Sequence, residues 1–553
     1  MTIHILSPET VARIRAGEVV DRPASIVKEL IENALDADAT KIVIDIWDGG
    51  KAKLSISDNG TGISPADLPL APLKHATSKI TDFDDVFQIV SLGFRGEALA
   101  SIGHVASLKL MSKSQGGEAY EISVVDGVIS ELSKTAHPQG TTVVVSDLFG
   151  TIPVRRGYLK SAATEFSYIY DQVLAFALIH PDVDFVLTHD HKEMLNTTGV
   201  SDPKTLLVLL FGKGIKAHLI DKTVGVERLL VRGIVTSAQL TFPNRNKQWF
   251  SVNGRPIKSA MLQKAVMQGY RDVIVPGRFP LVLIWIGLPP VGIDANIHPQ
   301  KHEIKFLSPG PVFDALQAFF KSVHQQEHEV IGGTLSGYSP SLPSPQEVQQ
   351  TLDLYSSVST GYTVPTTLSY LHVFDTYIFL KTPEGIWVLD QHAVHERILY
   401  EKIKIMWGNW EESQLLIGGD IVRLRPDQYS LAFHEQAYFR EMGVTFEDFG
   451  QYQIKLCQVP LFLQGLSLPE FFDVVLDGLK TQDRADMSLA QKEKLQMMAC
   501  KAAIKAGNKM SEPEIRQLLL DFQASPANFT CPHGRPLFIK LDKPALEKLF
   551  LRR

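Results

Sequence analysis

The sequence predicts a multidomain α/β protein, and three observations lead to that class. The chain has 553 residues, which exceeds what a single hydrophobic core organises and corresponds to roughly three or four domains. Helix and strand patterns alternate through residues 1–205. Residues 332–367 are rich in Ser, Pro, Gly, Thr and Gln, so we expect them to form a flexible linker between two halves.

The first predicted domain spans residues 1–205. Its first clear element is a helix at Ala24–Asp36, which Pro23 opens because proline is tolerated in the first helical turn. Ile42, Ile44 and Ile46 then alternate with polar residues, as expected of a half-buried strand. Helix and strand patterns in alternation favour an α/β domain.

A second domain is predicted at residues 206–331. It contains strand patterns at Leu229–Val235 and Leu281–Ile286 and a helical stretch at Ser259–Tyr270, a mixture that indicates an α+β domain. The third predicted domain spans residues 368–553. It opens with a hairpin at Tyr377–Leu389, and residues 420–500 are predicted to be an inserted subdomain.

Composition limits the class of protein. Hydrophobic content of 44% and charged content of 21% are ordinary for a globular protein, and a net charge of −6 provides no overall attraction to nucleic acid. DNA binding would therefore require a local basic groove. Three cysteines make no even disulfide framework, and no signal peptide or membrane-spanning run is recognisable. We expect a cytoplasmic protein with no membrane partner.

A group of residues near the N-terminus has the pattern of a nucleotide site. Glu29 and Asn33 are four apart and share a helix face, where the carboxylate could activate a water and the amide oxygen could bind magnesium. Asp58 ends a strand and could accept the adenine amino hydrogen, while Gly60 and Gly62 allow close backbone approach.

A second glycine segment follows. Gly93 and Gly96 bracket Arg95 immediately before a predicted helix at Glu97–Ile102, a geometry that presents amide hydrogens to phosphate. Each piece alone is more typical of a solvated helix face or an ordinary turn. Their order and combination favour a nucleotide site.

Taken together, these motifs resemble the GHKL ATPases, and within them the MutL family of mismatch repair proteins. The stretches that carry the resemblance are Arg15–Val20, Lys74–Lys79, Gly93–Ile102, Phe250–Arg255 and Asn296–Glu303. The resemblance implies a Bergerat-type α/β sandwich ATPase, a transducer-like second domain, and a lid around residues 70–100. It implies ATP and Mg²⁺ as cofactors, bound by Asn33, Asp58, Gly60, Gly62, Thr77, Lys79, Gly93, Phe94, Arg95, Gly96, Thr142 and Lys301.

Two clusters in the C-terminal half offer metal ligands. Asp390, His392 and Glu396 occupy a predicted strand-to-helix turn, and Cys531 and His533 lie far downstream. Thiolate and imidazole favour zinc, while carboxylates also accept manganese or magnesium. Either cluster alone would more often be a hydrogen-bonded turn or a packed loop. Together they predict a Zn²⁺ or Mn²⁺ site, with Asp390 and Glu396 as catalytic residues.

The resemblance is to nuclease-competent members of the family. It implies a homodimeric ATP-dependent clamp on double-stranded DNA, with a dimerisation and endonuclease domain that nicks a strand after the mismatch-recognition protein MutS has acted. Gln414–Gly419 resembles a peptide that binds the replication sliding clamp, except that Gly419 replaces the expected proline; an ordinary connecting segment is the alternative. The rival function is an ATP-gated scaffold with a purely structural zinc site. Structural zinc usually has only N and S ligands, so the carboxylates favour catalysis.

Overall fold

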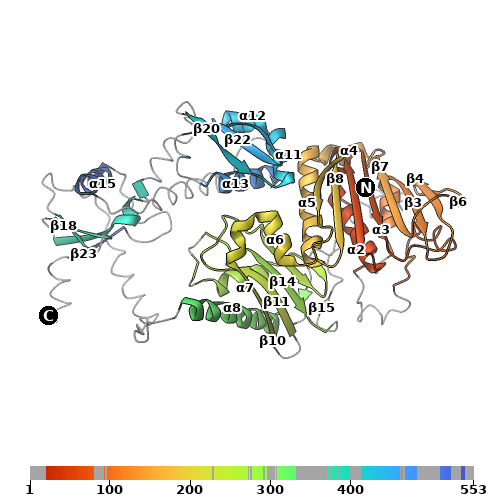
Figure 1. Ribbon diagram of the computed structural model, residues 1–553, viewed down its shortest axis with the longest axis horizontal. Helices are drawn as coiled ribbons and strands as arrows, with labels where there is room; N and C mark the ends of the chain where they lie inside the picture. Colours follow the sequence, from red (N-terminus) through yellow and green to blue (C-terminus); the bar gives the residue numbers. More distant parts are fainter. Residues whose placement is uncertain are drawn as a thin grey trace, which may run out of the picture. The chain divides into compact units, whose positions relative to one another are not determined.

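The computed structural model describes most of the N-terminal half and separate parts of the C-terminal half (Figure 1). The described residues are 20–79, 92–93, 96–226, 229–271, 273–274, 277–289, 293–294, 305–306, 308–331, 370–373, 376–382, 385–395, 397–398, 413–460, 463, 467–481, 511–524, 537–541 and 543. The chain divides into two compact units, residues 1–331 with 424–435 and residues 332–423 with 436–553. Among the described residues, no helix is both long and apolar enough to cross a membrane.

A large sheet forms the framework of the first unit. Within the described residues it has nine strands in the order β5-β4-β3-β7-β2-β1-β8-β9, with β6 paired to β4. The pairing of β1 with β8 is parallel, whereas β1 and β2 are antiparallel neighbours. The strands are β1 (Lys41–Trp47), β2 (Lys53–Asp58), β3 (Ser107–Lys113), β4 (Tyr120–Val125), β5 (Val128–Ile129), β6 (Ser133–Lys134), β7 (Gly140–Ser146), β8 (Asp184–His189) and β9 (Lys192–Asn196).

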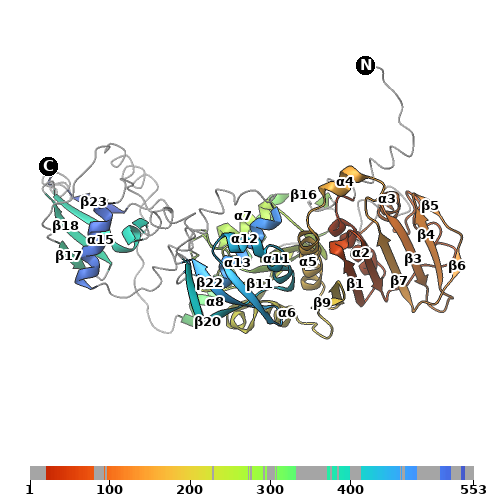
Figure 2. The same ribbon diagram turned by 90° about the horizontal axis from the view of Figure 1, so that it is seen from above.

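Helices pack on this sheet to make an α/β sandwich. Helix α2 (Pro23–Asp36) contacts β2, α3 (Ala98–Val105) contacts β3, and α5 (Ala162–Ile179) contacts β8. Because α2 also contacts both α3 and α5, the three helices form one layer (Figure 2). The short elements η1 (Asp48–Gly50) and α4 (Pro153–Tyr158) lie in the connections. The predicted first helix is confirmed, with its proline in the first turn.

The strand prediction is also confirmed by burial. The side chains of Ile42, Ile44 and Ile46 in β1 are fully buried, and the residues between them are more exposed. This alternation matches a strand with one face on the core. The apolar periodicity of the sequence therefore reports the inner face of the sheet, against which the helical layer packs.

A second sheet follows in the same unit. Its five described strands have the order β10-β11-β14-β12-β13, and helices α7 and α8 pack together beside it. Gly233 in β11 is closely covered by the ring of Phe319 in α8, where a Cβ atom would lie 2.6 Å from the ring. The elements are α6 (Pro203–Phe211), η3 (Lys213–His218), β10 (Leu219–Val226), β11 (Leu229–Thr236), β12 (Gln248–Val252), β13 (Arg255–Ile257), α7 (Ala260–Gly269), β14 (Val282–Gly287), β15 (Ile293–Asp294), β16 (Lys305–Phe306) and α8 (Pro309–Ile331).

One helix from later in the chain belongs to the first unit. Helix α11 (Pro426–His434) contacts α5 and β9. The hydroxyl of Ser167 donates to the buried carboxylate of Asp427 at 3.0 Å, and Arg425 pairs with that carboxylate at the same distance. The sequence analysis predicts these residues to be part of an inserted C-terminal subdomain, and that domain division stays a prediction.

The second unit contains two sheets. One has the described order β17-β18-β19-β23, in which Thr382 pairs with Gly385, so the predicted hairpin is confirmed. The other has the order β20-β22-β21. The elements are β17 (Tyr370–Val373), β18 (Tyr377–Thr382), β19 (Gly385–Asp390), β20 (Ser413–Arg423), α12 (Gln436–Glu441), β21 (Thr445–Gly450), β22 (Gln453–Pro460), α13 (Leu468–Thr481), α15 (Glu512–Ala524) and β23 (Phe538–Leu541).

Candidate nucleotide and metal sites

Helix α2 places the predicted ATPase base beside a buried ion-pair cluster. The ammonium of Lys28 lies 3.2 Å from Glu29 and 3.1 Å from Glu32. Burial lowers the pKa of Lys28, but the charges of Glu32 and Glu29 outweigh that effect and raise it above the usual value. Lys28 therefore remains charged and holds the Glu29 carboxylate in a defined position.

The predicted magnesium ligand already faces a cation. The side-chain oxygen of Asn33 accepts a hydrogen bond from the Lys79 ammonium at 3.0 Å. Lys79 is anchored in turn by the Asp36 carboxylate at 2.5 Å. The amide oxygen of Asn33 is thus oriented toward a position that suits positive charge. Thr77 supports the same segment, because its hydroxyl accepts from the backbone N–H of Lys79 at 3.2 Å.

Asp36 also holds the next predicted glycine segment. Its carboxylate accepts the backbone N–H of Leu92 at 2.7 Å and that of Gly93 at 2.8 Å. Leu92 is fixed from its other side by Arg255, whose guanidinium donates to the Leu92 carbonyl. Arg255 is buried and lies in β13 of the second sheet.

Arg255 is presented by a tight hairpin turn. Asn253 and Gly254 have φ values of 48° and 82°, and Val252 pairs with Arg255 across the turn. Two successive positive φ angles are typical of the two-residue hairpin that an Asn-Gly sequence favours. The turn directs the guanidinium out of the second sheet and onto the segment beside α2.

Asp58 lies at the end of β2, as predicted. Its Oδ1 accepts the backbone N–H groups of Gly60 at 2.9 Å and Thr141 at 3.2 Å. Burial raises the pKa of the Asp58 carboxyl, and the two backbone hydrogen bonds oppose that shift. Beside it, the Thr142 hydroxyl hydrogen-bonds with Ser57 at 2.8 Å and with the His137 ring at 2.7 Å.

The glycines of this region lie against the backbone. Gly62 has a φ of +71°, and a Cβ atom there would lie 2.2 Å from the Lys113 carbonyl oxygen. Gly96 has a φ of +60°, and its added Cβ would lie 2.5 Å from the carbonyl oxygen of Ala76. Both positions require glycine for conformation and for space. Phe94, Arg95 and Lys301, the remaining predicted nucleotide contacts, lie outside the described residues.

In the C-terminal unit, Asp390 ends β19 and caps the following helical residues, 391–395. Its Oδ1 accepts the backbone N–H groups of His392 at 2.9 Å and Ala393 at 3.1 Å. The His392 ring nitrogen Nδ1 lies 3.9 Å from the same oxygen, and both side chains are about half exposed. The predicted strand-to-helix turn is therefore present, with two of its predicted ligands close together.

The rest of the predicted metal site is not described. Glu396, Cys531 and His533 lie outside the described residues, and in the part that is described no three His, Cys, Asp or Glu side chains form a possible metal site. The zinc or manganese site stays a prediction. One contact bears on it: the Asp390 N–H donates to the Leu537 carbonyl at 3.0 Å, and Leu537 directly follows the Cys531–Pro536 motif.

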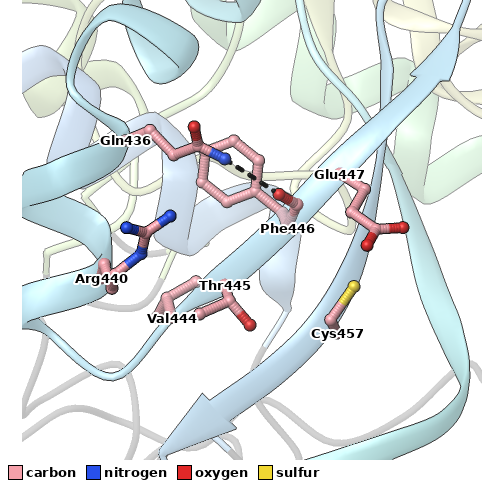
Figure 3. Close-up of a pocket in the computed structure, with 7 residues that line it drawn as sticks. All are labelled: Gln436, Arg440, Val444, Thr445, Phe446, Glu447 and Cys457. Carbon is pink, nitrogen blue, oxygen red and sulfur yellow. Dashed lines mark hydrogen bonds between the residues drawn. The ribbon is translucent and has the colours of Figure 1, made fainter.

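A separate pocket lies between helix α12 and strands β21 and β22 (Figure 3). Its cavity volume is about 220 Å³, and the Gln436 amide donates to the Phe446 carbonyl at 3.2 Å. Its lining residues are Gln436, Arg440, Val444, Thr445, Phe446, Glu447 and Cys457. None of the predicted nucleotide or metal residues lines it. The predicted clamp-binding segment lies in β20, where the pairing with β22 is irregular between Leu415 and Asp420.

The sequence analysis predicted no functional role for Asp36 and Arg255, two residues of the nucleotide region. Asp36 lies three residues after Asn33, a spacing that places both on neighbouring positions of one helix face. That spacing was a usable signal. Arg255 had no local signal, because its contact with Leu92 joins residues far apart in the sequence.

Three family models match the chain. Residues 22–143 match the histidine kinase-, DNA gyrase B- and HSP90-like ATPases, residues 207–325 match the C-terminal domain of DNA mismatch repair proteins, and residues 371–510 match the MutL C-terminal dimerisation domain. The first match covers α2 and β2, which carry Glu29, Asn33 and Asp58.

Curated relatives match over the full length. DNA mismatch repair protein MutL of Thermoanaerobacter pseudethanolicus is 33% identical over 100% of this chain and 99% of its own. The protein of the same name from Coxiella burnetii (strain Dugway 5J108-111) is 34% identical over 100% of both. Among solved structures, the crystal structure of the N-terminal domain of a DNA repair protein matches with a TM-score of 0.50 and 26% identity. It covers 58% of this chain and 99% of that one, and it agrees with the predicted ATPase fold.

Proposed function

Because the chain belongs to the MutL family of DNA mismatch repair proteins, we propose that it is an ATP-dependent homodimeric clamp on DNA that couples mismatch recognition to strand nicking. Its ATPase and dimerisation domains match family models, which support the nucleotide and dimer parts of this function. The partners are double-stranded DNA, the mismatch-recognition protein MutS, and a replication sliding clamp at Gln414–Gly419. DNA would bind to local basic surface, since the whole chain is acidic overall.

The ATPase proposal rests on how α2 and β2 set their polar side chains. Glu29 is the base that takes a proton from the attacking water, and Lys28 keeps its carboxylate in place. Asp58 accepts the adenine amino hydrogen through a carboxylate that Gly60 and Thr141 already orient. Thr142, next to Thr141 on β7, lies at the same edge of the site.

Asn33 fits the predicted magnesium ion. Its amide oxygen is a hard ligand, and in this structure it already accepts a cationic donor, the Lys79 ammonium at 3.0 Å. When bound, magnesium would neutralise charge that develops on the phosphoryl oxygens. Lys79 is held in place by the Asp36 carboxylate, which also accepts the backbone N–H groups of Leu92 and Gly93. Lys301 is the proposed γ-phosphate contact by family resemblance.

The endonuclease proposal rests on the register between β19 and β23. The bond from Asp390 to Leu537 supports a site in which the Asp390–Glu396 cluster and the Cys531–His533 cluster meet. A thiolate, two imidazoles and carboxylates fit zinc or manganese. When bound, the metal would activate a water and stabilise the leaving oxygen of a phosphodiester. The capping bonds of Asp390 would hold its carboxylate at the turn.

Nicking of supercoiled plasmid tests the function as a whole. The purified full chain should convert the plasmid to the open circular form with manganese, and ATP hydrolysis should be measurable in the same preparation. Asp390→Asn should lose nicking while ATP hydrolysis and dimerisation persist. A wild-type protein that hydrolyses ATP but nicks no plasmid with any divalent metal would instead support the ATP-gated scaffold with structural zinc. In that case Cys531→Ser should lower both zinc content and C-terminal stability.

A further inference from the structure

We propose that Asp36 is a positioning residue for the ATP site, which orients the metal-binding oxygen of Asn33 and links it to the second sheet through Arg255. The inference rests on the proposed ATPase function and adds a role for two residues that this function did not use. It is carried by one continuous hydrogen-bond path among described residues: Arg255, Leu92, Asp36, Lys79 and Asn33.

The Asp36 carboxylate lies at the centre of this path. Its side chain is only 8% exposed, and it accepts three donors. Oδ1 accepts the Leu92 N–H, while Oδ2 accepts the Gly93 N–H and the Lys79 ammonium. A buried carboxylate is retained only when such donors satisfy it. The three donors come from two places in the sequence, so Asp36 joins both of them to helix α2.

Asp36 affects the side-chain orientation of Asn33 through Lys79. An amide side chain can rotate to present either oxygen or nitrogen, and only the oxygen binds a metal. The Lys79 ammonium, which has donors and no acceptor, stabilises the oxygen-inward orientation. Because Asp36 fixes Lys79, the carboxylate determines indirectly which Asn33 atom faces the site. The Lys79 ammonium therefore places a positive charge at the oxygen that would hold magnesium.

Arg255 connects this path to the second sheet. Arg255 is 6% exposed and donates to the Leu92 carbonyl, so Leu92 is held by Asp36 at its N–H and by Arg255 at its oxygen. The Asn253-Gly254 turn sets the direction of the arginine. A displacement of this hairpin would therefore act on the same peptide that Asp36 holds beside Asn33.

The test measures binding of a fluorescent ADP derivative to the full chain, with EDTA and with magnesium. The readout is the dissociation constant in EDTA divided by that in magnesium. This ratio reports how much the metal strengthens nucleotide binding. Asp36→Asn keeps the side-chain volume but removes the charge and one acceptor, so this ratio should fall roughly tenfold or more. Asp38→Asn is the matched control, because Asp38 is exposed and asparagine tolerates its φ of 56°. Its ratio should equal that of the wild type.

Two further variants separate positioning from a general loss of structure. Lys79→Met alters a partly exposed side chain, and its effect on the ratio should not add to that of Asp36→Asn in the double variant. Arg255→Lys should reduce the ratio in the same direction, whereas Lys258→Met, at an exposed position nearby, should leave it unchanged. Circular dichroism without nucleotide checks that each variant is folded. If Asp36→Asn does not fold, the Lys79→Met and Arg255→Lys variants still test whether the hydrogen-bond path controls the contribution of magnesium to nucleotide binding.

The outcomes are distinct. Equal ratios for Asp36→Asn and wild type, or fully additive effects in the double variant, would overturn the positioning role. A loss of affinity that is the same in EDTA and magnesium would also overturn it, since it would indicate a structural role only. If the wild type itself shows no magnesium dependence of nucleotide binding, the proposed ATP site is the part that fails.

Discussion

The backbone N–H of Asp390 donates to the carbonyl of Leu537 at 3.0 Å. This bond lies beside the β19–β23 pairing, in which Leu389 faces Phe538. It joins the strand end that carries Asp390 to the residue that directly follows Pro536. Asp390 and Leu537 are therefore far apart in the sequence but directly hydrogen-bonded in the structure.

Asp390→Asn and Asp390→Ala should both abolish nicking, but only the alanine variant should lose stability. Asparagine is as good a helix N-cap as aspartate, so it can still accept the His392 and Ala393 amides. Alanine removes the cap and should lower the free energy of unfolding by about 1 kcal/mol. Plasmid nicking and thermal unfolding of both variants check this. Asp420→Asn, at an exposed position of β20, is the control for lost charge.

Glu29→Gln should bind nucleotide and hydrolyse it about 10²- to 10⁴-fold more slowly, because it removes the base but keeps the shape of the side chain. The Lys28–Glu32 ion pair would remain. Single-turnover hydrolysis and equilibrium nucleotide binding measure the two effects separately. Glu131→Gln, an exposed change elsewhere in the domain, should have no effect on either. Undiminished turnover by Glu29→Gln would exclude this residue as the base.

Asp58→Asn should weaken ATP binding yet make the folded protein more stable at neutral pH. Burial raises the folded-state pKa of Asp58, so the wild type loses stability as pH rises from the unfolded-state pKa through the folded one. Asparagine avoids that loss and can still accept from Gly60 and Thr141. The stability gain should be present at pH 7 and vanish below the pKa of the unfolded aspartate. Denaturant unfolding at several pH values measures this gain. A gain that grows toward acid pH would contradict a raised pKa of Asp58 in the folded protein.

Gly62→Ala should be clearly more destabilising than Gly116→Ala. The two glycines have nearly the same φ, +71° and +70°, so the conformational penalty of about 1 kcal/mol is common to both. Only Gly62 faces the Lys113 carbonyl, whereas the space around Gly116 is open. The clash should add ~2 kcal/mol at Gly62. Thermal unfolding of the two variants measures the difference, and equal losses would show that the contact is relieved without cost.

The local sequence pattern predicted individual helices and strands but not the long-range contacts between them. The isoleucine alternation at 42, 44 and 46 predicted β1, and the four-residue spacing of Glu29 and Asn33 placed them on α2, because both signals lie within one element. The roles of Asp36 and Arg255 arise from contacts with Lys79 and Leu92, which no local period reports. The nine-stranded order likewise depends on long-range pairing. The family resemblance supplied Lys301, whereas the two-residue spacing of Cys531 and His533 was visible in the sequence itself; both assignments stay predictions.

Because β1 pairs in parallel with β8, this side of the sheet cannot form until β8 has been synthesised. Lys41 pairs with Asp184, a separation of 143 residues (184 − 41), which a ribosome takes about 7–29 s to translate. During that interval β1 has β2 as a partner on one side and an open edge on the other. A nascent chain stalled before β8 would expose this edge, a template for aggregation. The free edge of β1 is therefore unprotected until β8 has been synthesised, and pairing with another chain is favoured during that interval.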